Sequence, residues 1–167
     1  LVEPMTYNIV GGPKKGTAEF AKRKPEMVIE TARRLCPLGM DVLKAEFPDD
    51  PDHEQDESAM AEHCRQLTEA AGIPWVLLSA GVGYDKFKVQ TRIACENGAS
   101  GFLAGRAIWQ EAPSLPMEEQ DDFLASTSVQ RLNELSGLAN ENGRPWTDIY
   151  GDALDQVDIA EGWQERY

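Results

Sequence analysis

The run Asp41-Val42-Leu43-Lys44-Ala45-Glu46-Phe47-Pro48 is the most strand-like stretch of this 167-residue chain, and it has a lysine at its centre. Period-two alternation predicts that Lys44 and Glu46 share one face of a strand. The opposite face is apolar and consists of Leu43, Ala45 and Phe47. Burial lowers a lysine's pKa from its reference of about 10.4, so that a partly neutral amine can attack a carbonyl and form a Schiff base. The alternative is a structural ion pair with Glu46 or another carboxylate.

Strands and helices alternate outward from this run. Strands are predicted at residues 1–5, 41–47, 75–78 and 101–104, and helices at about 25–35, 60–71, 84–94 and 117–139. Pro25 fits the first turn of its helix, and Val129, Leu132 and Leu135 form the core stripe of the last one. Four β-α units imply a parallel sheet with right-handed crossovers. A closed (β/α)8 barrel has eight such units in about 250 residues, so the chain is either a half barrel or a small open sheet.

Composition narrows the function classes. The chain has 41% hydrophobic residues, enough for the core of one domain, and a net charge of −13 that argues against binding nucleic acid or an anionic membrane. No apolar run approaches the roughly 18 residues of a membrane span. Three widely spaced cysteines on apolar helix faces predict reduced core residues of a cytoplasmic protein. The chain starts with Leu1 in an apolar run, which suggests that it begins inside a larger domain.

Chemically active residues cluster at the C-terminal ends of the predicted strands, where α/β folds place their sites. Glu3 lies in the first strand, where it can transfer protons beside the amine of Lys44 or simply form an ion pair with a lysine. Ser79-Ala80-Gly81 follows the third strand and Gly105-Arg106 follows the fourth. Glycine backbone N–H groups, a serine hydroxyl and an arginine together indicate a phosphate cradle. The alternative is a pair of tight turns with a solvated arginine.

A metal site is not predicted. His53 and His63 are the only histidines, and they lack the spacing of a zinc motif, which counts against a zinc-dependent aldolase. The acidic run at residues 49–57 lacks EF-hand spacing and is interpreted as a solvated loop. The Gly-rich run at residues 11–17 lacks the ending of a P-loop. The four tryptophans, Trp109 among them, are expected to pack cores or helix ends.

Several motifs resemble those of the tagatose-1,6-bisphosphate aldolase family, which includes the sulfofructosephosphate aldolases. They are VEPMTY (residues 2–7), KPEMVIE (24–30), DVLKAEFP (41–48), PWVLLSAGV (74–82) and GASGFLAGRAIW (98–109). The resemblance covers most of residues 1–146. It implies a class I aldolase on a (β/α)8 barrel, of which the chain has about the last four β-α units. Residues 147–167 would then be an acidic tail or packing arm.

The resemblance also assigns roles. It implies that Lys44 is the Schiff-base lysine and Glu3 the neighbouring proton-transfer carboxylate. Ser79, Gly81, Gly105 and Arg106 are implied as contacts of the substrate phosphate, with no metal or cofactor required. The expected reaction cleaves a phosphorylated ketose, such as tagatose 1,6-bisphosphate or 6-sulfofructose 1-phosphate, to dihydroxyacetone phosphate and an aldehyde. The last motif is closer to the sulfosugar branch, and residues 3–7 are closer to the tagatose branch.

Other functions remain open from the residues alone. One is a phosphosugar isomerase on the same barrel that uses Glu3 as a base without a covalent intermediate. The other is a non-catalytic barrel fragment. A half barrel exposes two unpaired sheet edges, so the expected partner is a missing N-terminal half-barrel or a second copy of the chain.

Overall fold

The computed structural model describes residues 1–8, 10–153 and 162, and its centre is a parallel sheet. The strands β1 (Leu43–Glu46), β2 (Trp75–Leu78) and β3 (Gly101–Leu103) lie in the order β1-β2-β3. The register pairs Lys44 with Val76 and Val76 with Gly101. The sheet confirms the predicted α/β class, and the three strands lie within the predicted ranges.

The strand predicted at residues 1–5 is reduced to one parallel bridge between Val2 and Leu43. Val2 N donates to Val42 O at 3.0 Å, and Lys44 N donates to Val2 O at 2.9 Å. The next donor in this ladder would come from residue 4, which is a proline and has no N–H. Pairing therefore stops after Val2, and Glu3 lies just beyond the bridge.

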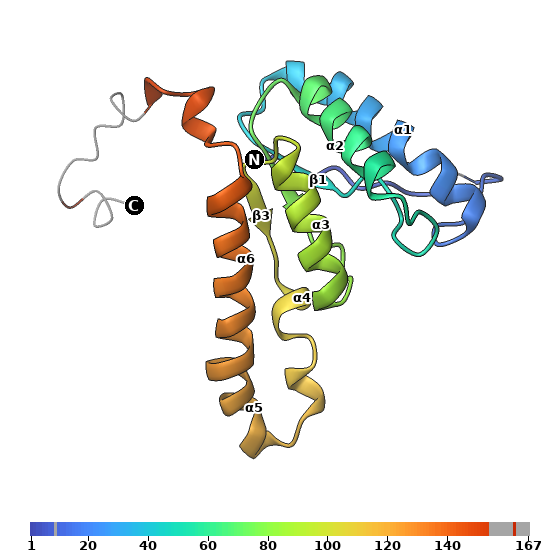
Figure 1. The fold of residues 1–167 in the computed structure, drawn as a ribbon. Helices are drawn as coiled ribbons and strands as arrows, with labels where there is room; N and C mark the ends of the chain where they lie inside the picture. Colours follow the sequence, from blue (N-terminus) through green and yellow to red (C-terminus); the bar gives the residue numbers. More distant parts are fainter. Residues whose placement is uncertain (9, 154–161, 163–167) are drawn as a thin grey trace.

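Helices that are neighbours in the chain pack side by side against the sheet (Figure 1). The long ones are α1 (Ala18–Leu35), α2 (Glu57–Ala71), α3 (Tyr84–Glu96) and α6 (Val129–Asn142). Shorter elements are η1 (Cys36–Leu38), α4 (Arg106–Trp109), η2 (Ala112–Ser114), α5 (Met117–Phe123), the π-helical turn η3 (Leu124–Ser128) and η4 (Trp146–Asp148). Within the described ranges, no helix is both long and apolar enough to span a membrane.

The predicted start of the first long helix was wrong. The side chain of Thr17 caps α1 by accepting a hydrogen bond from Phe20 N, so the helix begins at Ala18 and Pro25 lies inside it. The first turns then bury Phe20 and Ala21 against the rest of the molecule. Local capping and burial thus outweigh the preference of proline for the first helical turn.

The core confirms the alternation predicted for β1. Leu43, Ala45 and Phe47 are buried with Trp75 and Leu77 of β2 under the helices. Cys36, Cys64 and Cys95 are buried and free, as predicted for reduced core residues. Burial raises the pKa of each of these thiols, to about 11 for Cys95, so they are unreactive core groups.

The helix predicted at residues 117–139 is interrupted by η3, and its core stripe is only partly correct. Leu135 is buried, but Val129 and Leu132 are 49% and 46% exposed. Three residues of an α-helix turn by about 300°, so positions 129, 132 and 135 of α6 drift around the helix by about 60° at each step and do not form one face. Val129 and Leu135 are about 120° apart, and only Leu135 is buried in the core.

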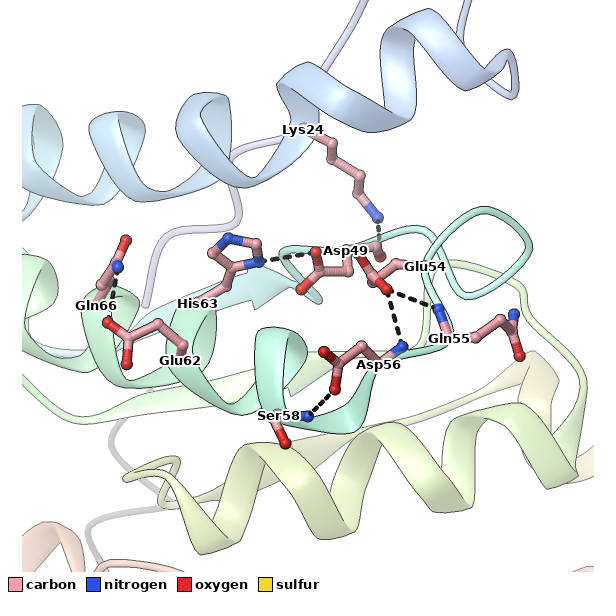
Figure 2. A network of polar contacts seen from close by, with 9 residues as sticks. All are labelled: Lys24, Asp49, Glu54, Gln55, Asp56, Ser58, Glu62, His63 and Gln66. Carbon is pink, nitrogen blue, oxygen red and sulfur yellow. Dashed lines mark hydrogen bonds and ion pairs between the residues drawn. The ribbon is translucent and has the colours of Figure 1, made fainter.

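The acidic loop after β1 is held by its own side chains and by residues of α1 and α2 (Figure 2). Asp49 is only 3% exposed, contrary to a fully solvated loop: His63 Nδ1 lies 2.8 Å from its Oδ1, and Lys24 Nζ donates to its backbone oxygen at 3.0 Å. Asp49 Oδ2 has no partner among the described residues, and burial raises the pKa of this carboxyl. Asp56 caps α2 by accepting from Ser58 N at 2.9 Å.

Candidate active site

The C-terminal ends of the strands surround an open hollow of about 510 Å³. Five of the six predicted site residues line it: Glu3, Lys44, Ser79, Gly105 and Arg106. Apolar side chains, including Met5, Leu78 and Leu103, form the rest of its wall. A concave apolar surface with a few convergent polar groups is the usual form of a small-molecule site.

The amine end of the hollow is formed by Glu3 and Lys44. Lys44 Nζ donates a hydrogen bond to Glu3 Oε2 at 2.7 Å, and the Lys44 side chain is 19% exposed. The bridge at Val2 places Glu3 beside Lys44, because paired residues of adjacent strands point to the same side. A carboxylate in hydrogen-bond contact with an amine can exchange a proton with it directly.

The alternative for Lys44 was an ion pair with Glu46 or another carboxylate, and its partner is the other carboxylate, Glu3. Glu46 instead binds residues of the N-terminal segment. It is 2% exposed and accepts from Thr6 N at 2.7 Å, Thr6 Oγ1 at 2.6 Å and Lys15 Nζ at 2.8 Å. Burial acts to raise the pKa of Glu46, but the hydrogen bonds from Lys15 and Thr6 outweigh it and hold the pKa below its usual value. These contacts fix the segment just after Glu3.

The anion end of the hollow is formed by residues 79–81 and 105–106. Val82 N donates to Ser79 O at 3.1 Å, and the two residues between them have positive φ, 51° at Ala80 and 78° at Gly81. This combination is typical of a type I′ turn. A positive φ is rare for alanine and marks local strain, which often accumulates at functional sites.

Gly81 does not line the hollow but packs against Arg106, which does. A Cβ at position 81 would lie 3.2 Å from Arg106 Nη2, so the guanidinium packs against the bare Cα. The structure therefore brings all six predicted residues together.

Sequence reasoning missed Trp109. It was expected to pack a core or a helix end, but it is 41% exposed and lines the hollow. A Cβ at Gly105 would lie 3.8 Å from its Nε1, which places the indole N–H beside the anion end. The signal that could have found it is its position one helical turn after Gly105.

Metal ligands do not converge in the part of the chain that the structure describes: it contains no group of three or more His, Cys, Asp or Glu side chains able to hold a metal ion. His63 is engaged with Asp49, and His53 lies near Gly16 O at 3.5 Å.

Comparison with known proteins identifies the relatives of this chain. Residues 6–111 match the model of the family described as DeoC/LacD family aldolase. The chain is also 29% identical over 165 residues to tagatose 1,6-diphosphate aldolases of Staphylococcus aureus strains JH9, Newman and N315. Each match covers 87% of this chain and 50% of the relative, so the chain spans about half the length of the curated relatives it matches. Because the family match extends over more than half of its residues, the chain belongs to the DeoC/LacD aldolase family, as its motifs predicted.

Proposed function

We propose that this chain forms the C-terminal half of the (β/α)8 barrel of a class I aldolase. The substrate would be a phosphorylated ketose, such as tagatose 1,6-bisphosphate or 6-sulfofructose 1-phosphate. The observation that carries the proposal is the contact of 2.7 Å between Lys44 Nζ and Glu3 Oε2 in the same hollow as Arg106. The site of a barrel enzyme lies at this end of its strands.

The reaction begins at the amine end. Neutral Lys44 attacks the C2 carbonyl of the ketose, and loss of water leaves an iminium ion. Glu3 takes the proton of the C4 hydroxyl while the C3–C4 bond breaks, and the electron pair of that bond moves into the iminium. An aldehyde leaves and the enamine of dihydroxyacetone phosphate stays on Lys44. Protonation at C3 and hydrolysis then release dihydroxyacetone phosphate and restore the amine.

The anion end would hold the phosphate of the C1 side of the substrate. Arg106 supplies a bidentate donor, Ser79 a hydroxyl, and Gly81 and Gly105 a close backbone approach. Binding the phosphate at one end orients C2 toward Lys44 at the other, and such positioning accounts for much of enzymatic rate enhancement.

A second half-barrel would close the site. The bridge at Val2 forms one edge of the sheet and β3 forms the other, and both Val2 and Leu103 are exposed there. Unpaired edges with apolar side chains favour association. The relatives are about twice as long as the matched region. We therefore propose that an N-terminal half-barrel like theirs, or a second copy of this chain, completes the barrel. A cytoplasmic location agrees with the three free cysteines.

Borohydride trapping with dihydroxyacetone phosphate tests the mechanism, with the adduct located by intact mass and peptide mapping. We expect a reduced adduct on Lys44 that is lost in Lys44→Met. Lys24→Met is the control, because burial lowers the pKa of Lys24, but this lysine donates to Asp49 O and does not line the hollow. An adduct on Lys24 would contradict the assignment.

A second sample contains the chain together with the N-terminal half of a relative. An adduct only in this sample would mean that the isolated half is inactive. No adduct in either sample would overturn the Schiff-base mechanism and leave the non-covalent isomerase or the non-catalytic fragment.

A further inference from the structure

The carbonyl of Ile108 lies at the C-terminal end of α4, the short helix that carries Arg106 and Trp109. Carbonyls in the last turn of a helix lack partners within the helix. Two side chains from the segment that contains η3 and α6 bind this one: Arg131 Nη1 donates to Ile108 O at 3.0 Å, and Ser128 Oγ donates at 3.3 Å. At the other end of the turn, Ile108 N donates to Gly105 O at 2.8 Å. The turn that bears Arg106 is therefore fixed at both ends.

Arg131 is itself held rigidly. Its two terminal nitrogens donate to the two carboxylate oxygens of Glu111 at 2.8 and 2.9 Å. Its guanidinium carbon lies 4.8 Å from the centre of the Tyr84 ring and 5.5 Å from that of Phe123. Such a planar, stacked and bidentate group has little freedom left, and lysine could not reproduce its contacts.

The π-helical turn η3 sets the face that reaches α4. Its extra residue rotates α6 relative to α5 by about 100°, one residue's share of an α-helical turn. Ser128 and Arg131 are three residues apart and share a face, and that face meets Ile108 O. π-helical turns are often found at functional sites.

We propose that Arg131 is a positioning residue for phosphate binding: it holds α4 by the carbonyl of Ile108, so that Arg106 stays packed on Gly81 at the anion end. Ser128 donates a second hydrogen bond to the same carbonyl, and the π-helical turn η3 sets which face of α6 meets α4. The inference rests on the phosphate role given to Arg106 in the proposed function. Arg131 does not line the hollow and acts only through α4.

The first test measures the affinity for inorganic phosphate by calorimetry in Arg131→Met and Glu111→Gln. Losing a hydrogen bond from a charged group to the carbonyl is expected to weaken phosphate binding about 10-fold in Arg131→Met. Glu111→Gln keeps the hydrogen bond from Arg131 to Ile108 O. Its affinity for phosphate should stay within about 2-fold of that of the unmodified chain, a difference in binding free energy of less than about half a kcal/mol. Equal affinities for the Arg131→Met variant and the unmodified chain would overturn the inference, as would no phosphate binding by either.

The second test separates positioning from a general loss of structure. Borohydride trapping at Lys44 is compared for dihydroxyacetone phosphate and for dihydroxyacetone, which has no phosphate. Arg131→Met should reduce adduct formation with dihydroxyacetone phosphate and leave adduct formation with dihydroxyacetone unchanged. Amide hydrogen exchange at Ile108 N and Gln110 N should become faster in this variant. An equal loss with both ketones, or unchanged exchange, would overturn the positioning role.

The two proposals can fail separately. If the unmodified chain forms no adduct with either ketone, with or without the second half-barrel, the Schiff-base mechanism fails, while the phosphate affinities still decide the role of Arg131.

Discussion

At the amine end of the hollow, the charged side chains bind one another directly. At the anion end, the lining residues are shaped by backbone geometry, and the charged side chain that holds them, Arg131, acts from outside the hollow. Glu46 receives three hydrogen bonds from Thr6 and Lys15, and Lys44 is bound to Glu3. At the anion end, the defining features are two consecutive positive φ angles, at Ala80 and Gly81, and an arginine packed on a bare Cα.

This difference predicts how each end responds to change. Hydrogen bonds to a buried carboxylate depend on its ionisation, so the amine end should be sensitive to pH. A turn with positive φ values depends on the absence or presence of Cβ, so the anion end should be sensitive to the size of small residues. The predictions below run from the largest expected effect to the smallest.

The largest effect is expected for Arg106→Met at the anion end. Hydrogen bonds to charged groups contribute about 1.5–3 kcal/mol, so affinity for inorganic phosphate should fall about 10- to 100-fold in calorimetry. Arg92→Met is the matched control, because Arg92 pairs with Glu57 and Glu96 on the outer helices. If Arg106→Met bound phosphate as the unmodified chain does, the anion end would be wrongly placed.

Glu46→Gln should lower the free energy of unfolding by about 1–3 kcal/mol at pH 7, because Lys15 and Thr6 lose a charged acceptor. The pKa of Glu46 is lowered on folding, so its stabilisation is fully present above the unfolded value of about 4.3 and is lost as pH falls through the folded pKa. Denaturant titrations at several pH values should therefore show the two proteins converging in acid.

Glu30→Gln is the control for that experiment. Hydrogen bonds from Arg34 and Arg33 also lower the pKa of Glu30, but this carboxylate lies on the surface of α1. Solvent screening makes such pairs weak, so the variant should unfold almost like the unmodified chain at every pH. If Glu30→Gln lowered the free energy of unfolding as much as Glu46→Gln does, burial of Glu46 would not explain the destabilisation.

Gly81→Ala should destabilise the chain by about 1 kcal/mol because alanine is strained at φ 78°. Its Cβ would also press on Arg106 Nη2 at 3.2 Å, and a small displacement of the guanidinium should weaken phosphate binding several-fold. Gly39→Ala is the matched control, since φ is 97° there and its Cβ would contact nothing within 4 Å. The Gly39→Ala variant should lose similar stability and bind phosphate as the unmodified chain does. If both variants lost phosphate affinity equally, the contact with Arg106 would be excluded as the cause.

The smallest effect is expected for Ala80→Gly, and it has the opposite sign. Glycine adopts φ 51° without strain but loses more entropy on folding, so the net gain should be about 0.5 kcal/mol. Denaturant midpoints give the measurement. A clear loss of stability would show that the alanine methyl group contributes packing that outweighs the strain.

The sequence predicted the parts of the site that depend on strand order and alternation. Lys44 faces the hollow because its neighbours 43 and 45 are apolar, and Ser79 and Arg106 meet because parallel strands end at one edge. The hydrogen bonds from Thr6 and Lys15 to Glu46 were not predictable, because these residues lie 40 and 31 positions away in the sequence and no periodic pattern links them to Glu46. Nor was the π-helical turn η3 predictable, since one extra residue in a helix leaves no trace in composition.

Pro4 ends the ladder beside Glu3, so Glu3 stands at the end of the paired backbone while Lys44 lies within it. The segment that carries Glu3 is tied to β1 at Val2 and to Glu46 at Thr6, and between these ties the proline makes no ladder bond. The proline ring and the two ties restrict the backbone of Glu3, so its carboxylate changes place by rotation of the side chain alone. In the proposed reaction it must serve several atoms in turn, first the amine, then the carbinolamine oxygen, then the C4 hydroxyl. The Glu3 side chain is 38% exposed at the end of the ladder, which leaves room for it to turn from one of these atoms to the next while its backbone stays in place.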